Sequence, residues 1–244
     1  MRARDLLLVL VIALAGCGQQ AEPPAAAPVV TSPGPELVGC NAGPSVAFTP
    51  LPVPGLAAGI AGDGPVGVVI ANTMQGYHCD WLVWADHLVK GGFRVAVFEY
   101  GFAPRAVGAE AMLERGAGEM TAVAAALRKA GAQKVVYAGG SLGGAVALAA
   151  AAKPEAGAAG VVSLSGGVEG QAGTAGRLTV PAIYAVAEDD TSGGAATLAK
   201  ELHEATGDSE LRVYPGLLHA GEMFNDPKYG PELLADLDAF LRKV

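Results

Sequence analysis

The feature that most constrains the fold is a serine held between glycines, at the point where a predicted strand meets a predicted helix. The apolar run 134–138 leads directly into Gly-Gly-Ser-Leu-Gly at residues 139–143, and a helix-favouring, Ala-rich stretch follows. A serine at such a turn adopts a strained backbone, and side chains two positions away would collide with the neighbouring strand and helix. Gly139 and Gly143 therefore indicate that Ser141 stands exposed at the edge of a sheet.

The rest of the chain alternates short apolar runs with helical patterns. Strands are predicted at 65–71, 94–98, 134–138, 160–164, 182–187 and 210–214. Helices are predicted from Trp81 to about residue 90, at 109–130, directly after Ser141, from about Gly194, and from about Pro231. Such alternation predicts an α/β fold, in which a mostly parallel sheet is covered by helices.

Composition favours a single domain. Of the 244 residues, 51% are hydrophobic and 16% are charged, which is enough apolar surface for one sizeable core. The formal net charge of −8 is not gathered into an acidic run or a basic patch, so charge indicates no nucleic-acid partner. We expect a monomer.

The first residues predict export. Arg2 and Arg4 precede an apolar run that is too short to span a membrane comfortably, so residues 1–16 are predicted to be a signal peptide. Leu-Ala-Gly-Cys at 14–17 resembles the bacterial lipobox, in which cleavage leaves a lipid-modified N-terminal cysteine, here Cys17. The alternative is an ordinary signal peptide with a chance cysteine. The lipobox implies an exported cell-envelope lipoprotein held at a membrane surface.

The stretch 17–37 is rich in Pro and Ala and has no period, so it predicts a flexible tether before a domain at 38–244. Cys40 and Cys79 lie in that domain. In an exported protein two cysteines are more often bridged than free, so we predict a disulfide, with two unpaired buried cysteines as the alternative. Because no Cys/His cluster has ligand spacing, the sequence predicts no metal site.

A serine hydroxyl is a poor nucleophile near neutral pH and needs a base, which in turn needs an orienting carboxylate. Where the nucleophile follows a strand in this way, the chain order is Ser, then Asp or Glu, then His. Only His203 and His219 follow Ser141. His203 lies in a polar helical stretch and is predicted to be a surface residue. His219 follows the last predicted strand, where a loop can carry its ring to the sheet edge, and is the predicted base.

The carboxylate is expected after the strand 182–187, where Glu188, Asp189 and Asp190 follow one another. We assign Asp190 because it lies farthest from the strand end. Asp189 stays an alternative, and either residue could instead cap the next helix.

Together, GGSLGG after KVVYA, VAEDD after a Pro-led strand and YPGLLHAGE before the last helix resemble the α/β-hydrolase superfamily, particularly its compact, dienelactone-hydrolase-like serine hydrolases. The resemblance runs from about residue 66 to the C-terminus. It implies an α/β-hydrolase fold and a serine hydrolase that cleaves carboxylic ester or related acyl bonds of a small molecule, without cofactor. Acyl transfer by the same residues, or a catalytically silent binding protein, are the alternatives.

Members of the superfamily often carry His-Gly after the strand that here ends at Ala71, whereas this chain has Asn72-Thr73. The resemblance then implies that the backbone N–H groups of Met74 and Leu142 form the oxyanion hole. A plain packing role for Met74 is the alternative. Residues 165–181 are mostly small, so we expect no cap domain and an open cleft above Ser141.

Overall fold

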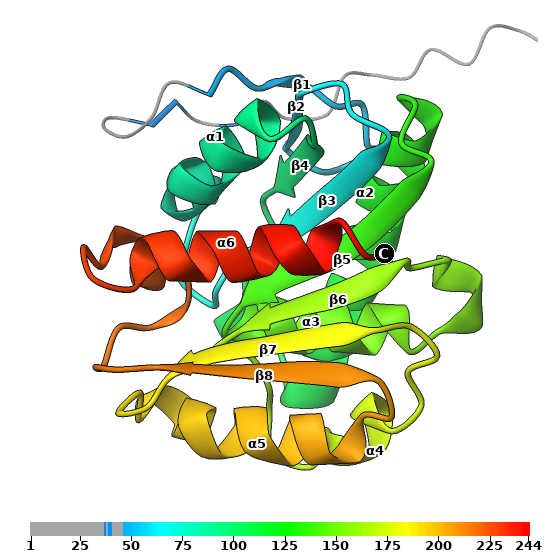
Figure 1. Cartoon of the computed structure of the whole chain (residues 1–244). Coiled ribbons are helices and arrows are strands. Elements are labelled where there is room, and N and C mark those ends of the chain that lie inside the picture. The colour runs from blue at the N-terminus through cyan, green and yellow to red at the C-terminus, as the bar shows by residue number, and fades with distance from the viewer. Residues whose placement is uncertain (1–36, 38, 41–45) are drawn as a thin grey trace, which may run out of the picture. The chain divides into compact units, whose positions relative to one another are not determined.

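The structure is a computed structural model that describes residue 37, residues 39–40 and residues 46–244 (Figure 1). The predicted signal peptide 1–16, Cys17 and the tether before Leu37 lie outside the described residues. Their assignments therefore stay predictions.

An eight-stranded sheet forms the centre of the described chain, in the order β1-β2-β4-β3-β5-β6-β7-β8. The strands are β1 (Thr49–Pro50), β2 (Ala58–Ala61), β3 (Val66–Ala71), β4 (Arg94–Phe98), β5 (Lys134–Gly140), β6 (Gly160–Leu164), β7 (Ala182–Ala187) and β8 (Ser209–Tyr214). The strands from β3 to β8 are parallel, whereas β2 pairs antiparallel with both β1 and β4. All six predicted strands are present. β1 and β2 were not predicted, because two and four residues are too few to show a period.

Helices cover both faces of the sheet. The α-helices are α1 (Leu82–Lys90), α2 (Ala109–Lys129), α3 (Leu142–Ala151), α4 (Ala172–Ala175), α5 (Ala195–Ala205) and α6 (Gly230–Leu241). Short 3₁₀ helices are η1 (His78–Trp81), η2 (Pro104–Ala106), η3 (Pro154–Ala156), η4 (Ser192–Gly194) and η5 (Ala220–Asn225). α1 and α6 pack on one face, and α2, α3 and α5 pack on the other (Figure 1).

The two helical layers explain why the central strands are apolar throughout. In β3, Val68 and Ile70 pack in the core with α1 and α6, whereas Val69 and Ala71 pack in the core with α2 and α3. All four side chains are fully buried. A strand buried on both faces reads as a continuous apolar run, which is the pattern that predicted it.

The order of the strands determines where a site can form. The chain runs from β3 to β4 on one side and then returns to β5 on the other side of β3. Ligands of open α/β sheets bind at such a reversal, beyond the carboxyl ends of the strands. Because Ala71 at the end of β3 pairs with Gly139 in β5, the loop after β3 and the turn that holds Ser141 are neighbours.

The connection between β6 and β7 contains only the four-residue helix α4, so the fold has no cap domain at this position, as predicted. Among the described residues, no helix combines the length and the apolarity that crossing a membrane would require.

Candidate active site

Ser141 occupies a strained turn between β5 and α3. Its backbone has φ 54° and ψ −121°, in the region that side-chain-bearing residues rarely adopt. A Cβ atom on Gly139 would collide with the backbone of Gly143, and one on Gly143 would collide with the carbonyl of Ala71. Glycine is therefore required at both positions for the turn to pack against β3. Ser141 is half-buried rather than exposed.

His219 and Asp190 form a hydrogen-bonded pair at the same sheet edge. His219 Nδ1 lies 2.7 Å from Asp190 Oδ2. The His219 side chain is 23% exposed, whereas the Asp190 side chain is fully buried. The pair can therefore present one imidazole nitrogen to solvent or substrate while the other nitrogen is held by a carboxylate.

The loop after β7 orients Asp190 inward. Its second oxygen, Oδ1, accepts a hydrogen bond from the Ser192 N–H at 3.0 Å. Glu188 and Asp189 are exposed. Their backbone N–H groups donate to the carbonyl oxygens of Tyr214, at the end of β8, and Gly216. Of the three acidic residues after β7, only Asp190 contacts a histidine.

His219 is carried by the segment between β8 and η5. The next residue, Ala220, has φ 50° and donates its N–H to Ser165 Oγ at 3.2 Å. A Cβ on Gly140 would lie 2.6 Å from the Ala220 side chain, so this segment packs directly against the residue before Ser141. Within the described chain Ser141 Oγ forms no hydrogen bond to His219, and such bonds are often long before substrate binds.

The other histidine beyond Ser141 lies elsewhere. His203 is half-buried near the end of α5, where its Nδ1 lies 2.7 Å from Ser209 Oγ. Ser209 begins β8, so His203 lies at the amino edge of the sheet, opposite to Ser141.

Asn72, which stands where relatives often have histidine, anchors the loop after β3. It is fully buried, and its Nδ2 donates to the Phe98 carbonyl at 2.8 Å and to Glu99 Oε2 at 3.0 Å. Trp81 Nε1 donates to Asn72 Oδ1 at 3.0 Å. This anchoring role was not predicted from the sequence, because Phe98 and Glu99 lie 26 and 27 positions from Asn72 and no local pattern links Asn72 to Trp81, nine positions on.

Tyr100 adds a fourth contact to this anchor. Its hydroxyl donates to the Asn72 carbonyl at 3.0 Å. Burial, and then the negative charges of Glu119 and Glu99, raise the pKa of Tyr100 above its usual range, so the hydroxyl stays a donor. These contacts hold the start of the loop that carries Met74.

Met74 and Leu142 meet Ser141 at one cavity of about 390 Å³. Leu142 is the first residue of α3, so its N–H has no partner within the helix. Met74 is 38% exposed, and Met112 and Leu198 contribute apolar side chains to the same walls. The cavity is therefore more apolar than the open cleft that the sequence predicted, because α2 and α5 approach the site.

A second cavity, of about 610 Å³, shares Met74 and Gln75 with the first. It is lined by Tyr77, His78 and Glu99, among others, and Ser141 does not reach it. It is the larger of the two, but only the smaller one is lined by Ser141.

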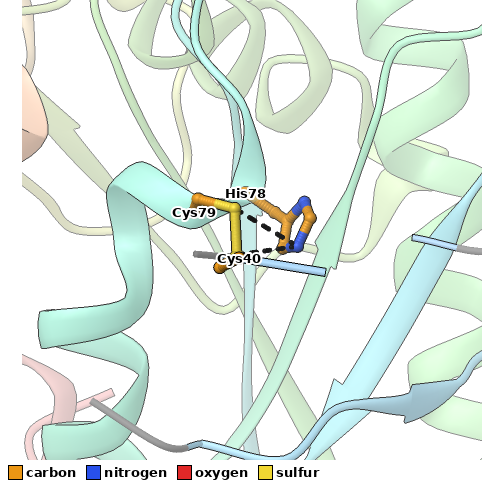
Figure 2. Close-up of side chains that lie close together, drawn as sticks. All are labelled: Cys40, His78 and Cys79. Carbon is orange, nitrogen blue, oxygen red and sulfur yellow. Dashed lines mark hydrogen bonds between the residues drawn. A yellow bond between two sulfur atoms is a disulfide. The ribbon is translucent and has the colours of Figure 1, made fainter. Parts of the chain in front are cut away.

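Cys40 and Cys79 form the predicted disulfide, which joins the segment before β1 to η1. His78 lies beside it and was not singled out from the sequence. Its Nδ1 lies 2.6 Å from Glu99 Oε1 (the geometry around Nε2 is shown in Figure 2).

A parallel sheet with a glycine-framed serine after β5 and a His–Asp pair after β8 and β7 defines the α/β hydrolases. Residues 55–232 match the model of the dienelactone hydrolase family, and the chain belongs to that family. It is therefore a hydrolase. No curated protein matches the sequence.

Several solved structures share the fold. A predicted CIB-like hydrolase from Thermoplasma acidophilum is 16% identical, with 82% of this chain and 99% of that chain covered and a TM-score of 0.67. Dienelactone hydrolase from Anabaena variabilis is also 16% identical, with 77% and 91% covered and a TM-score of 0.63. A monoacylglycerol lipase from Paleococcus ferrophilus is 14% identical, with 76% and 98% covered and a TM-score of 0.63.

Proposed function

We propose that the protein is a serine hydrolase that cleaves carboxylic esters through an acyl-enzyme, with Ser141, His219 and Asp190 as its catalytic triad. The observation that carries the proposal is the 2.7 Å contact between His219 Nδ1 and the buried Asp190, next to a serine in a strained turn. A histidine held in this way by a carboxylate presents Nε2 as a base.

The first half of the reaction forms the acyl-enzyme. Ser141 Oγ attacks the ester carbonyl carbon while His219 Nε2 takes the hydroxyl proton. The carbonyl oxygen becomes an oxyanion, which the N–H groups of Met74 and Leu142 stabilise. The carbon–oxygen bond to the alcohol then breaks, and His219 returns the proton to the leaving alcohol.

The second half repeats these steps with water. His219 takes a proton from water, the resulting hydroxide equivalent attacks the acyl carbon, and the bond to Ser141 Oγ breaks with return of the proton to Ser141. The products are an alcohol and a carboxylic acid. Asp190 holds the Nδ1–H tautomer of His219 throughout and exchanges no proton.

Covalent labelling tests this assignment. A fluorophosphonate probe should label the parent protein at Ser141, and p-nitrophenyl acetate should be hydrolysed. Ser141→Ala should abolish labelling, and Ser141→Ala and His219→Ala should each lower kcat by about 10³-fold or more.

His203→Gln is the matched control, because His203 lies at the opposite edge of the sheet, where its Nδ1 is 2.7 Å from Ser209 Oγ. This variant should be labelled by the probe and should hydrolyse p-nitrophenyl acetate like the parent. Labelling that persists in Ser141→Ala, or a folded parent protein that the probe does not label, would contradict the proposal.

A further inference from the structure

The disulfide Cys40–Cys79 and the ring of His78 bring three metal-ligand atoms together outside the active site. His78 Nε2 lies 3.3 Å from Cys40 Sγ and 3.8 Å from Cys79 Sγ (Figure 2). We propose that reduction of this disulfide creates a binding site for a thiophilic cation such as Zn²⁺, with Cys40 Sγ, Cys79 Sγ and His78 Nε2 as the ligands.

The spacing of the three atoms suits zinc. Zinc–sulfur bonds of about 2.3 Å and zinc–nitrogen bonds of about 2.0 Å in a tetrahedron put a sulfur and a nitrogen ligand about 3.5 Å apart and two sulfur ligands about 3.8 Å apart. The two sulfur–nitrogen distances already lie close to the first of these values. Only the two sulfur atoms must separate, and they do so when their bond is broken.

The histidine is oriented as a ligand. Its side chain is 5% exposed, and Nδ1 lies 2.6 Å from Glu99 Oε1. The same carboxylate oxygen accepts the His78 backbone N–H at 3.0 Å, and the other oxygen accepts Asn72 Nδ2. Donation from Nδ1 to the carboxylate leaves the Nε2 lone pair facing the sulfurs, and metal-bound histidines have such carboxylate partners.

Both the reductant and the cation can reach the site. Cys40 and Cys79 are half-buried, and the cavity of about 610 Å³ is lined by His78 and Cys79. Three protein ligands beside this cavity would leave the fourth position of a tetrahedral zinc open to water.

The redox step balances with a thiol reductant. A dithiol transfers two electrons and two protons to the S–S bond, which breaks into two cysteine thiols while the dithiol becomes its own disulfide. Zn²⁺ then displaces one proton from each thiol and binds the two thiolates and the neutral imidazole. The oxidised form offers no thiolate, so the site is open only in the reduced protein.

Zinc titration of the mature, folded protein tests the proposal. The protein is reduced with a phosphine, which becomes a phosphine oxide with oxygen from water, and Zn²⁺ binding is followed by calorimetry against the oxidised protein. We expect one Zn²⁺ per reduced chain, bound at least a hundredfold more tightly than to the oxidised chain. X-ray absorption should show two sulfur neighbours at about 2.3 Å and one histidine nitrogen at about 2.0 Å.

His78→Gln should weaken zinc binding by at least tenfold, and Cys40→Ala/Cys79→Ala should abolish the stoichiometric binding. His87→Gln is the matched control, because His87 also contacts a carboxylate, Asp238 at 2.9 Å, but does not belong to the group formed by Cys40, His78 and Cys79. This variant should bind zinc like the parent. Circular dichroism checks that each form is folded.

Four results would overturn the proposal: equal binding by the oxidised and reduced proteins, stoichiometric binding by the double cysteine variant, a reduced protein that stays folded and binds no zinc, or one that unfolds on reduction. Zinc that binds nonspecifically or at His219 would also bind to the oxidised protein and to the double cysteine variant. The first two results therefore reveal binding at such other places.

Discussion

Asp190 and His219, which lie 29 positions apart in the sequence, form a contact of 2.7 Å between Oδ2 and Nδ1, whereas the neighbouring Asp189 is exposed. The buried carboxylate holds the imidazole and is itself held by the Ser192 N–H. The two aspartates therefore differ in burial and in contact with His219, although they are adjacent in the chain.

We expect Asp190→Asn to lower kcat for p-nitrophenyl acetate by about 10³-fold or more, because an amide favours the wrong tautomer of His219. Asp189→Asn, an identical chemical change one residue away, should alter kcat by less than about threefold. That corresponds to a change of less than about 1 kcal/mol in the activation free energy. Steady-state kinetics of both variants measures this difference. The reverse order would reject Asp190 as the orienting residue.

Gly143→Ala should destabilise the protein by about 1–3 kcal/mol, because the new methyl group would collide with the carbonyl of Ala71. Gly118→Ala is the matched control, because Gly118 lies on the exposed surface of α2, where a Cβ atom meets nothing within 4 Å. It should stabilise by about 0.5–1 kcal/mol. Urea unfolding gives both values, and equal stability of the two variants would show that the turn tolerates a side chain.

Cys40→Ala/Cys79→Ala should lower the free energy of unfolding by about 4 kcal/mol in the chain-entropy model, since the bridge closes a long loop. The cysteines are 39 positions apart. The parent protein unfolded under reducing conditions is the control and should show a similar loss. Unchanged stability in both would mean that the bridge does not form in solution.

The acyl preference should follow the volume of the cavity at Ser141. Each methylene buried against Met112 and Leu198 contributes up to about 0.8 kcal/mol. That gain ends once the chain outgrows a cavity of about 390 Å³. We expect kcat/KM on p-nitrophenyl esters to be greatest for short acyl chains, with no activation at a lipid interface. A steady rise to the palmitoyl ester would contradict the assignment of this cavity.

Cys17→Ala should prevent lipid attachment in a bacterial host that processes lipoproteins, since the Leu-Ala-Gly-Cys sequence requires the cysteine as acceptor. The parent should partition into the detergent phase and the variant into the aqueous phase. Cys40→Ala is the control, because it removes a cysteine outside the lipobox and should leave partitioning unchanged. Equal partitioning of parent and Cys17→Ala would reject the anchor.

Local patterns in the sequence determined most of the fold. Strands buried on both faces read as continuous apolar runs, and 94–98, 160–164 and 182–187 were predicted with the bounds that the structure has. The glycines around Ser141 were predictable because a strained turn needs them within two residues of the serine. The pairing of Asp190 with His219 could be anticipated because each follows a strand of one parallel sheet.

Only the tertiary structure decided which distant side chains surround these positions. Asn72 is anchored by Phe98, Glu99 and Trp81, and His78 faces a disulfide whose first cysteine lies 38 positions earlier. Such contacts have no period and no fixed spacing along the chain, because they depend on how whole strands and loops pack. The volumes of the two cavities and the grouping of Cys40, His78 and Cys79 were therefore beyond the reach of sequence patterns.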